Sequence, residues 1–98
     1  MARFLDVDPR TLHLPTPRWD GACPIKFSRQ FSSFGLSTVG MIPPEVVEDP
    51  EGRLMIMDGV TRATRVAKFL PGQSIRVQVT DSVRYSVANY PTVADRLP

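Results

Sequence analysis

The chain has little cysteine, histidine and lysine, and it has no long apolar run. Its one cysteine, Cys23, allows neither an internal disulfide nor a thiolate metal cluster, and its one histidine, His13, excludes histidine-rich metal sites. No apolar run approaches the roughly 20 residues that span a bilayer, so we expect no membrane partner. Asp6 and Asp8 lie where a signal peptide needs its apolar centre, and a cytoplasmic location is therefore expected.

Net charge is also small. Twelve Lys and Arg residues against ten Asp and Glu residues leave +2, which is too little for a protein that coats DNA. Ten of the twelve cations are arginine, whose guanidinium forks around phosphate oxygens, although an arginine-rich genome produces the same bias. A length of 98 residues, 42% of them apolar, suits one small domain, and we treat residues 1–98 as such.

The first part of the chain, residues 1–43, is rich in proline and predicts few regular elements. A short strand is expected at residues 4–7, and extended chain or loop at residues 12–24. One helix is expected at residues 27–35, because three phenylalanines recur at i, i+4 and i+7 and Gly35 follows them. Such an aromatic stripe is typical of a core face, and its members are Phe27, Phe31 and Phe34.

The middle part, residues 44–80, is more regular and carries the predicted core. It contains a strand at 44–49, a turn at 49–52, a buried strand at 53–58, a helix at 60–70 and an alternating strand at 74–80. The apolar face of the helix consists of Val60, Ala63, Val66, Ala67 and Leu70. Its opposite face carries Thr61, Arg62, Arg65 and Lys68. The pattern predicts an α+β fold in which a helix follows a strand–glycine turn and packs on a small mixed sheet.

The last part, residues 81–98, is a C-terminal tail with fewer signals. Tyr85, Val87 and Tyr90 are placed to extend or cover the sheet, and residues 92–97 predict one helical turn after Pro91.

The sharpest local feature is the glycine between the buried strand and the helix. Free backbone N–H groups and the helix dipole converge at a helix N-terminus, which makes it a natural anion site. Gly59 would let the backbone approach a phosphate, Thr61 would donate its hydroxyl and Arg62 its guanidinium. Arg65, one turn later, would extend the same positive face.

A plainer interpretation of the same residues stays open. Asp58 or Gly59 would cap the helix, while the two arginines would be solvated or would pair with Glu45 and Glu48. Acidic residues near the turn also offer a metal site: Asp58 and Glu48 are the candidates for holding Mg²⁺ with a nucleotide, because Mg²⁺ prefers oxygen ligands. The alternative is that these acids are solvated turn residues.

The order of these motifs resembles the ParB/sulfiredoxin superfamily. The resemblance rests on residues 40–46, 52–62, 67–68 and 75–77, with an upstream Pro17-Arg18 and the predicted helix at 27–35, and it covers roughly residues 4–80. Members typically show a glycine before a proline-led strand, a second strand that runs into a Gly-x-x-Arg box, and a helix with a closing strand. The resemblance implies a ParB/sulfiredoxin-like fold with an ATP or CTP site, Mg²⁺ included, at the Gly59–Arg62 turn.

Two positions depart from the family pattern. ParB proteins usually carry an acidic residue and then an arginine inside the box, where this chain has Val60 and Thr61. Sulfiredoxins carry their catalytic cysteine where this chain has Val60, so sulfinic-acid reduction is not expected. The chain also lacks the helix-turn-helix and dimerisation regions of a chromosome-partitioning ParB, so operator binding is not expected.

Two functional hypotheses follow. In the first, the domain binds a nucleotide or nucleic-acid phosphate at Gly59, Thr61, Arg62 and Arg65, with Mg²⁺-dependent phosphotransfer or nuclease chemistry as an extension. In the second, it is a non-catalytic, antitoxin-like regulatory module whose proline-rich N-terminal half and Trp19 contact a partner protein. Whether the chain is an enzyme stays open, and a second copy of the chain is a further candidate partner.

Overall fold

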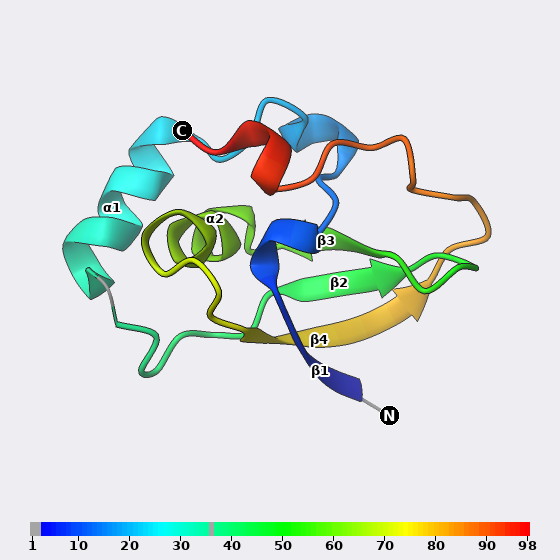
Figure 1. Ribbon diagram of the computed structural model, residues 1–98, viewed down its shortest axis with the longest axis horizontal. Helices are drawn as coiled ribbons and strands as arrows, with labels where there is room; N and C mark the ends of the chain where they lie inside the picture. Colours follow the sequence, from blue (N-terminus) through cyan, green and yellow to red (C-terminus); the bar gives the residue numbers. More distant parts are fainter. Residues whose placement is uncertain (1–2, 36) are drawn as a thin grey trace.

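Four strands form one mixed sheet in the order β1-β4-β2-β3 (Figure 1). A computed structural model describes residues 3–35 and 37–98. Strand β4 pairs antiparallel with β1 and parallel with β2, while β2 pairs antiparallel with β3. The prediction of a small α+β fold with a mixed sheet is confirmed. The strands are β1 (Arg3–Val7), β2 (Glu45–Glu48), β3 (Leu54–Asp58) and β4 (Ile75–Ser82).

Two α-helices and three short 3₁₀ turns complete the described chain. None of its helices has both the length and the apolar character that crossing a membrane requires. The helices are α1 (Pro24–Phe34) and α2 (Val60–Phe69), and the 3₁₀ turns are η1 (Pro9–Thr11), η2 (Thr16–Arg18) and η3 (Ala94–Arg96). The predicted helical turn within 92–97 is therefore present as η3.

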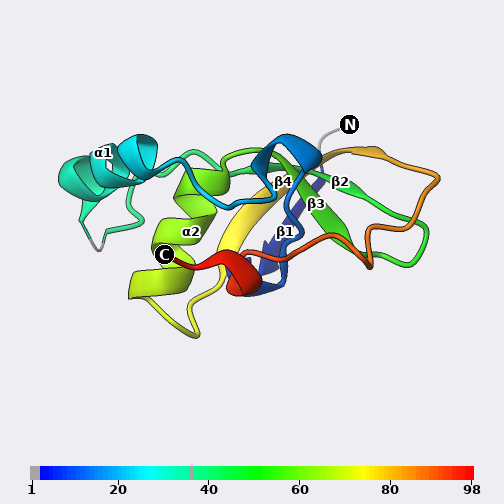
Figure 2. The ribbon, with the colours of Figure 1, turned by 90° about the horizontal axis from the view of Figure 1, so that it is seen from above.

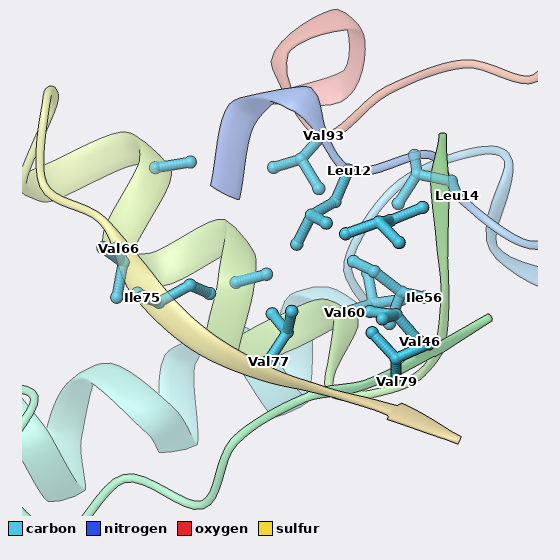
Figure 3. Packing of buried hydrophobic residues seen from close by; sticks show 13 residues of the cluster. Leu12, Leu14, Val46, Ile56, Val60, Val66, Ile75, Val77, Val79 and Val93 are labelled. Carbon is cyan, nitrogen blue, oxygen red and sulfur yellow. The ribbon is translucent and has the colours of Figure 1, made fainter. Parts of the chain in front are cut away.

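The main core lies between α2 and one face of the sheet (Figure 3). The apolar face predicted for the helix is confirmed: its first four members are buried, and Leu70 is partly buried against them. Alternate residues of β4 meet this face, because successive side chains of a strand point to opposite sides. The fully buried side chains that close the core come from α2, three of the strands and both ends of the chain: Val46, Ile56, Ala63, Val66, Val77, Leu12, Leu14 and Val93.

Residues 12–14 extend the sheet beyond β3. The His13 N–H donates to the Leu54 carbonyl (2.9 Å) and the His13 carbonyl accepts from the Ile56 N–H (2.9 Å), which is parallel pairing. On its other side His13 forms an antiparallel bridge with Thr92. The extended chain predicted here is confirmed, and the structure adds that it joins β3 to the C-terminal segment.

The segment after β4 covers the far end of the β2–β3 hairpin. Val87 is fully buried, and together with Tyr90 it packs on Val47 and Met55 in a second small cluster. Of the two predicted roles for this segment, covering the sheet is therefore the one observed.

Asp49 joins this segment to the hairpin turn. Its side chain is almost fully buried, and its carboxylate accepts the backbone N–H groups of Glu51 (2.9 Å), Arg53 (2.8 Å) and Val87 (3.0 Å). Burial raises the pKa of this carboxyl, but those N–H groups and the Arg53 guanidinium outweigh burial and hold the pKa of Asp49 below its ordinary value.

This lowered pKa predicts an acid-dependent loss of stability. A carboxyl with a lower pKa in the folded than in the unfolded chain stabilises the fold above about pH 4, and this stabilisation disappears as the pH falls through the folded pKa. We expect Asp49→Asn to be less stable than the wild type at pH 7 and to lose less stability between pH 5 and pH 2.5. Urea unfolding across this range measures both effects, and parallel pH profiles would contradict the assignment.

Helix α1 lies at the margin of the fold, beside α2 and away from the sheet (Figures 1 and 2). It begins at Pro24, earlier than predicted, because proline suits the first position of a helix. The expectation that its aromatic stripe belongs to the core is wrong for Phe31, which packs against Phe69 with its ring tilted by 41° (4.8 Å between centroids) but stays 42% exposed. Phe27 also packs on Phe69 and is half-buried, while the side chain of Phe34 lies outside the described part.

Candidate functional site

The turn between β3 and α2 depends on Gly59. This residue has φ +104° and ψ +21°, a left-handed conformation that glycine adopts without strain. A Cβ at this position would lie 2.8 Å from Pro44 Cβ and 2.8 Å from Arg62 Nη2. The sequence suggested that Gly59 admits a phosphate; the structure shows that it admits the ring of Pro44 and the guanidinium of Arg62.

A cavity of about 380 Å³ opens beside this turn. Three separate segments form its wall: the chain around η2, one face of α1, and the β3–α2 turn. Its lining residues are Pro15 and Arg18; Lys26, Arg29, Gln30 and Ser33; and Met57, Asp58, Gly59, Val60, Thr61 and Arg62.

The lining is strongly cationic. It contains four cations, Arg18, Lys26, Arg29 and Arg62, and a single carboxylate, Asp58. Within residues 3–35 and 37–98, the first three of these cations form no ion pair. A concave surface that gathers unpaired positive charges focuses their electric field. It therefore raises the local concentration of anions.

Arg62 is the most enclosed of these cations. Its side chain is 17% exposed, and its Nη2 lies 3.3 Å from Asp58 Oδ2, whose side chain is 71% exposed. Two buried polar atoms of the lining, Arg62 Nε and Gln30 Oε1, have no hydrogen-bond partner among the described residues. The structure thus brings together three of the four predicted phosphate-binding residues, because Gly59, Thr61 and Arg62 all line the cavity.

Arg65 is not part of this site. The expectation that it extends the positive face of the helix is wrong, since the residue is only 1% exposed. Its guanidinium donates to the carbonyls of Gly35 (3.0 Å) and Ser37 (2.6 Å) and contacts the sulfur of Met41 (3.4 Å). Arg65 therefore anchors the loop between α1 and β2 to α2.

The two residues predicted to hold a metal lie apart. Asp58 is in the cavity, whereas Glu48 lies opposite Leu54 at the other end of β3 and pairs with Arg3 (2.7 Å). Leu54 and Asp58 are four positions apart along β3, which corresponds to about 13 Å. Among the described residues, no three His, Cys, Asp or Glu side chains gather as a metal site.

Sequence analysis missed the contribution of α1. Lys26, Arg29, Gln30 and Ser33 recur at i, i+3, i+4 and i+7, so they form one polar stripe along the helix. That periodicity was available in the sequence. The segment that the stripe faces, the β3–α2 turn, is a long-range neighbour that local patterns do not specify.

The chain matches no protein-family model, no curated protein and no solved structure.

Proposed function

We propose that the chain binds a nucleotide or a nucleic-acid phosphate in the cavity between α1 and the N-terminus of α2. The observation that carries this proposal is the convergence of Arg18, Lys26, Arg29 and Arg62 from three segments onto one cavity with a single carboxylate. Folding such cations together costs electrostatic energy, which a bound anion offsets. Phosphate suits the site because a helix N-terminus and a guanidinium both favour it.

Six of the lining residues have a definite role in this proposal. Gly59 precedes α2 without capping it through a side chain, so the first N–H groups of the helix remain for an anion. Arg62 supplies a charge-assisted donor beside them, and Thr61 a hydroxyl. Lys26 and Arg29 face the same anion from α1. Met57, which is 56% exposed, offers an apolar surface to a base.

The ParB/sulfiredoxin resemblance is part of the same proposal. The glycine and arginine of the box, Gly59 and Arg62, both line the cavity, which supports a divergent member of that superfamily. Val60 occupies the position of the catalytic cysteine of sulfiredoxins. Because Val60 is buried and apolar, we do not propose that the chain reduces sulfinic acids.

Magnesium enters this proposal only with the nucleotide. Protein sites for nucleotide-bound Mg²⁺ commonly use one or two carboxylates together with phosphate oxygens. Asp58 is the carboxylate available in the lining. To bind the metal, it would have to give up its ion pair with Arg62. Phosphotransfer or nuclease chemistry would depend on that exchange.

Substitution of Arg62 tests the proposal directly. We expect Arg62→Gln to weaken the binding of ATP or CTP by about 10- to 150-fold, because a hydrogen bond to a charged group contributes about 1.5–3 kcal/mol. A thermal-shift panel of ATP, CTP, GTP, ADP and pyrophosphate, with and without Mg²⁺, measures this. At 100 times its dissociation constant, a ligand raises the free energy of unfolding by about 2.7 kcal/mol, which is roughly 10 °C or more here.

The matched control is Arg76→Gln. Arg76 carries the same charge on β4, is exposed and lies outside the cavity, so its loss should leave the thermal shift unchanged. An absence of any shift with all five ligands would refute the proposal.

A second candidate function is supported by exposed apolar side chains in the N-terminal half. This protein-interaction hypothesis predicts that no phosphate ligand stabilises the chain. The side chains concerned are Trp19 (40% exposed), Ile25 (64%), Phe31 (42%), Val39 (83%) and Ile42 (68%).

A further inference from the structure

Three aromatic side chains form a row on the surface of the molecule. Trp19 meets Tyr90 edge-on with 5.3 Å between ring centroids, and Tyr90 lies nearly parallel to Tyr85 at 6.3 Å. Trp19 is 40% exposed and Tyr85 is 49% exposed. We call Trp19, Tyr90 and Tyr85 the aromatic row. Two of its rings therefore remain accessible, although burial would be the usual outcome for side chains of this size.

The aromatic row begins beside the cationic cavity. Arg18 lines the cavity and Trp19 is the next residue in the chain. The carbonyl of Trp19 accepts a hydrogen bond from Arg96 Nε (2.9 Å), which links it to the C-terminal segment and places a second cation nearby. Trp19 thus has one arginine next to it in the chain and a second one hydrogen-bonded to its carbonyl.

Nearby acids reduce this positive charge only in part. Asp58 is already engaged by Arg62. The Asp95 carboxylate accepts the Thr92 N–H (2.9 Å). Asp20 is exposed and follows Trp19 directly, so it is the carboxylate closest in sequence to the row. Five cations outnumber these three acids: Arg18, Lys26, Arg29 and Arg62 of the cavity, together with Arg96.

We propose that the aromatic row and the cavity together bind single-stranded nucleic acid. This inference rests on the proposed function and names its ligand class: a phosphate occupies the cavity while neighbouring bases stack on Trp19 and Tyr85. Cations that follow the backbone, interleaved with aromatic rings that stack on bases, are the combination that single-strand-binding proteins use. A duplex would not fit, because its base faces are hidden within the stack.

Trp19 provides the probe for the test, because it is the one tryptophan in the sequence. Titration of the full chain with dT10 and rU10 decamers should quench Trp19 fluorescence, and the affinity should fall as salt rises from 50 to 200 mM. Stacking of one base typically changes affinity by about 5- to 150-fold on truncation of the aromatic side chain. We therefore expect Tyr85→Leu to weaken decamer binding within that range and to leave the binding of ATP or CTP unchanged.

Phe4→Leu is the matched control. Phe4 is 48% exposed on β1, close to the exposure of Tyr85, and it belongs neither to the row nor to the cavity. Its substitution should change neither affinity. The decamer that binds more tightly, dT10 or rU10, identifies DNA or RNA as the source of the strand.

The outcomes separate this inference from the proposed function. If a mononucleotide binds and needs Arg62, but decamers bind no more tightly or Tyr85→Leu has no effect, the inference is overturned and the proposed function stands. If neither mononucleotides nor decamers bind, both fail. Decamer binding that is weakened by both Arg62→Gln and Tyr85→Leu supports both.

Discussion

Replacement of Gly59 by alanine is expected to lower the free energy of unfolding by about 2–5 kcal/mol. Left-handed backbone costs a residue with a Cβ roughly 1–2 kcal/mol, and overpacking adds about 1–3 kcal/mol. The added Cβ would lie 2.8 Å from Pro44 Cβ and 3.0 Å from Pro44 Cα. Because Pro44 Cα is a backbone atom, no side-chain rotation can relieve this contact. Thermal unfolding should show a midpoint lower by roughly 10–40 °C. Phosphate binding should weaken as well, since Arg62 Nη2 lies against the same position.

Gly72→Ala is the matched control for this collision. Gly72 also has a positive φ, +87°, but a Cβ there would have no neighbour within 4 Å in the described part of the chain. The variant should therefore lose only the roughly 1–2 kcal/mol of backbone strain and retain ligand binding. Equal destabilisation of the two variants would show that the contact with Pro44 does not limit the Gly59 turn.

Replacement of Arg65 by methionine is expected to cost about 3–6 kcal/mol. Methionine preserves much of the apolar volume, but it leaves the carbonyls of Gly35 and Ser37 without the donor that they share. Each hydrogen bond to a charged group contributes about 1.5–3 kcal/mol. Urea unfolding measures the loss. The carbonyls lie directly after α1, so the variant should also loosen the helix that carries Lys26 and Arg29.

Arg65→Lys distinguishes the geometry of this contact from its charge. Lysine keeps the charge but has no planar fork to reach two carbonyls at once, so we expect it to restore less than half of the loss. Full rescue by lysine would mean that charge alone anchors the loop. Arg76→Met, at an exposed position, should change stability by less than about 0.5 kcal/mol.

The β3–Gly59–α2 unit could be predicted from sequence because its signals are local. Four consecutive apolar residues precede Gly59, and a helical period begins at Val60. The turn chemistry around Asp49 is local in the same sense. The sequence could predict that Gly59, Thr61 and Arg62 lie together for this reason: all three belong to the turn and to the first turn of the helix that follows it.

Arg65 shows why the remainder could not be predicted. In an amphipathic helix an arginine usually indicates the solvated face. The carbonyls that accept hydrogen bonds from Arg65 lie 28 and 30 residues earlier, in the loop after α1. The same limit applies to Lys26 and Arg29, whose role depends on where α1 docks. Glu48 failed as a partner of Asp58 because Glu48 lies at the turn end of the β2–β3 hairpin, opposite Leu54, whereas Asp58 lies at the far end, opposite Glu45.

The pairing of residues 12–14 between β3 and the segment around Thr92 has a consequence for synthesis on the ribosome. Strand β1 must also wait for β4, its partner about 70 residues later in the chain. Contacts between such distant segments form late, because a long loop must close first. Until Val93 has emerged, the nascent chain carries the apolar side chains of Leu12 and Leu14 uncovered beside an open edge of β3. Most of the core therefore assembles only after the segment around Val93 has emerged from the ribosome, and until then the exposed edge is a target for chaperones.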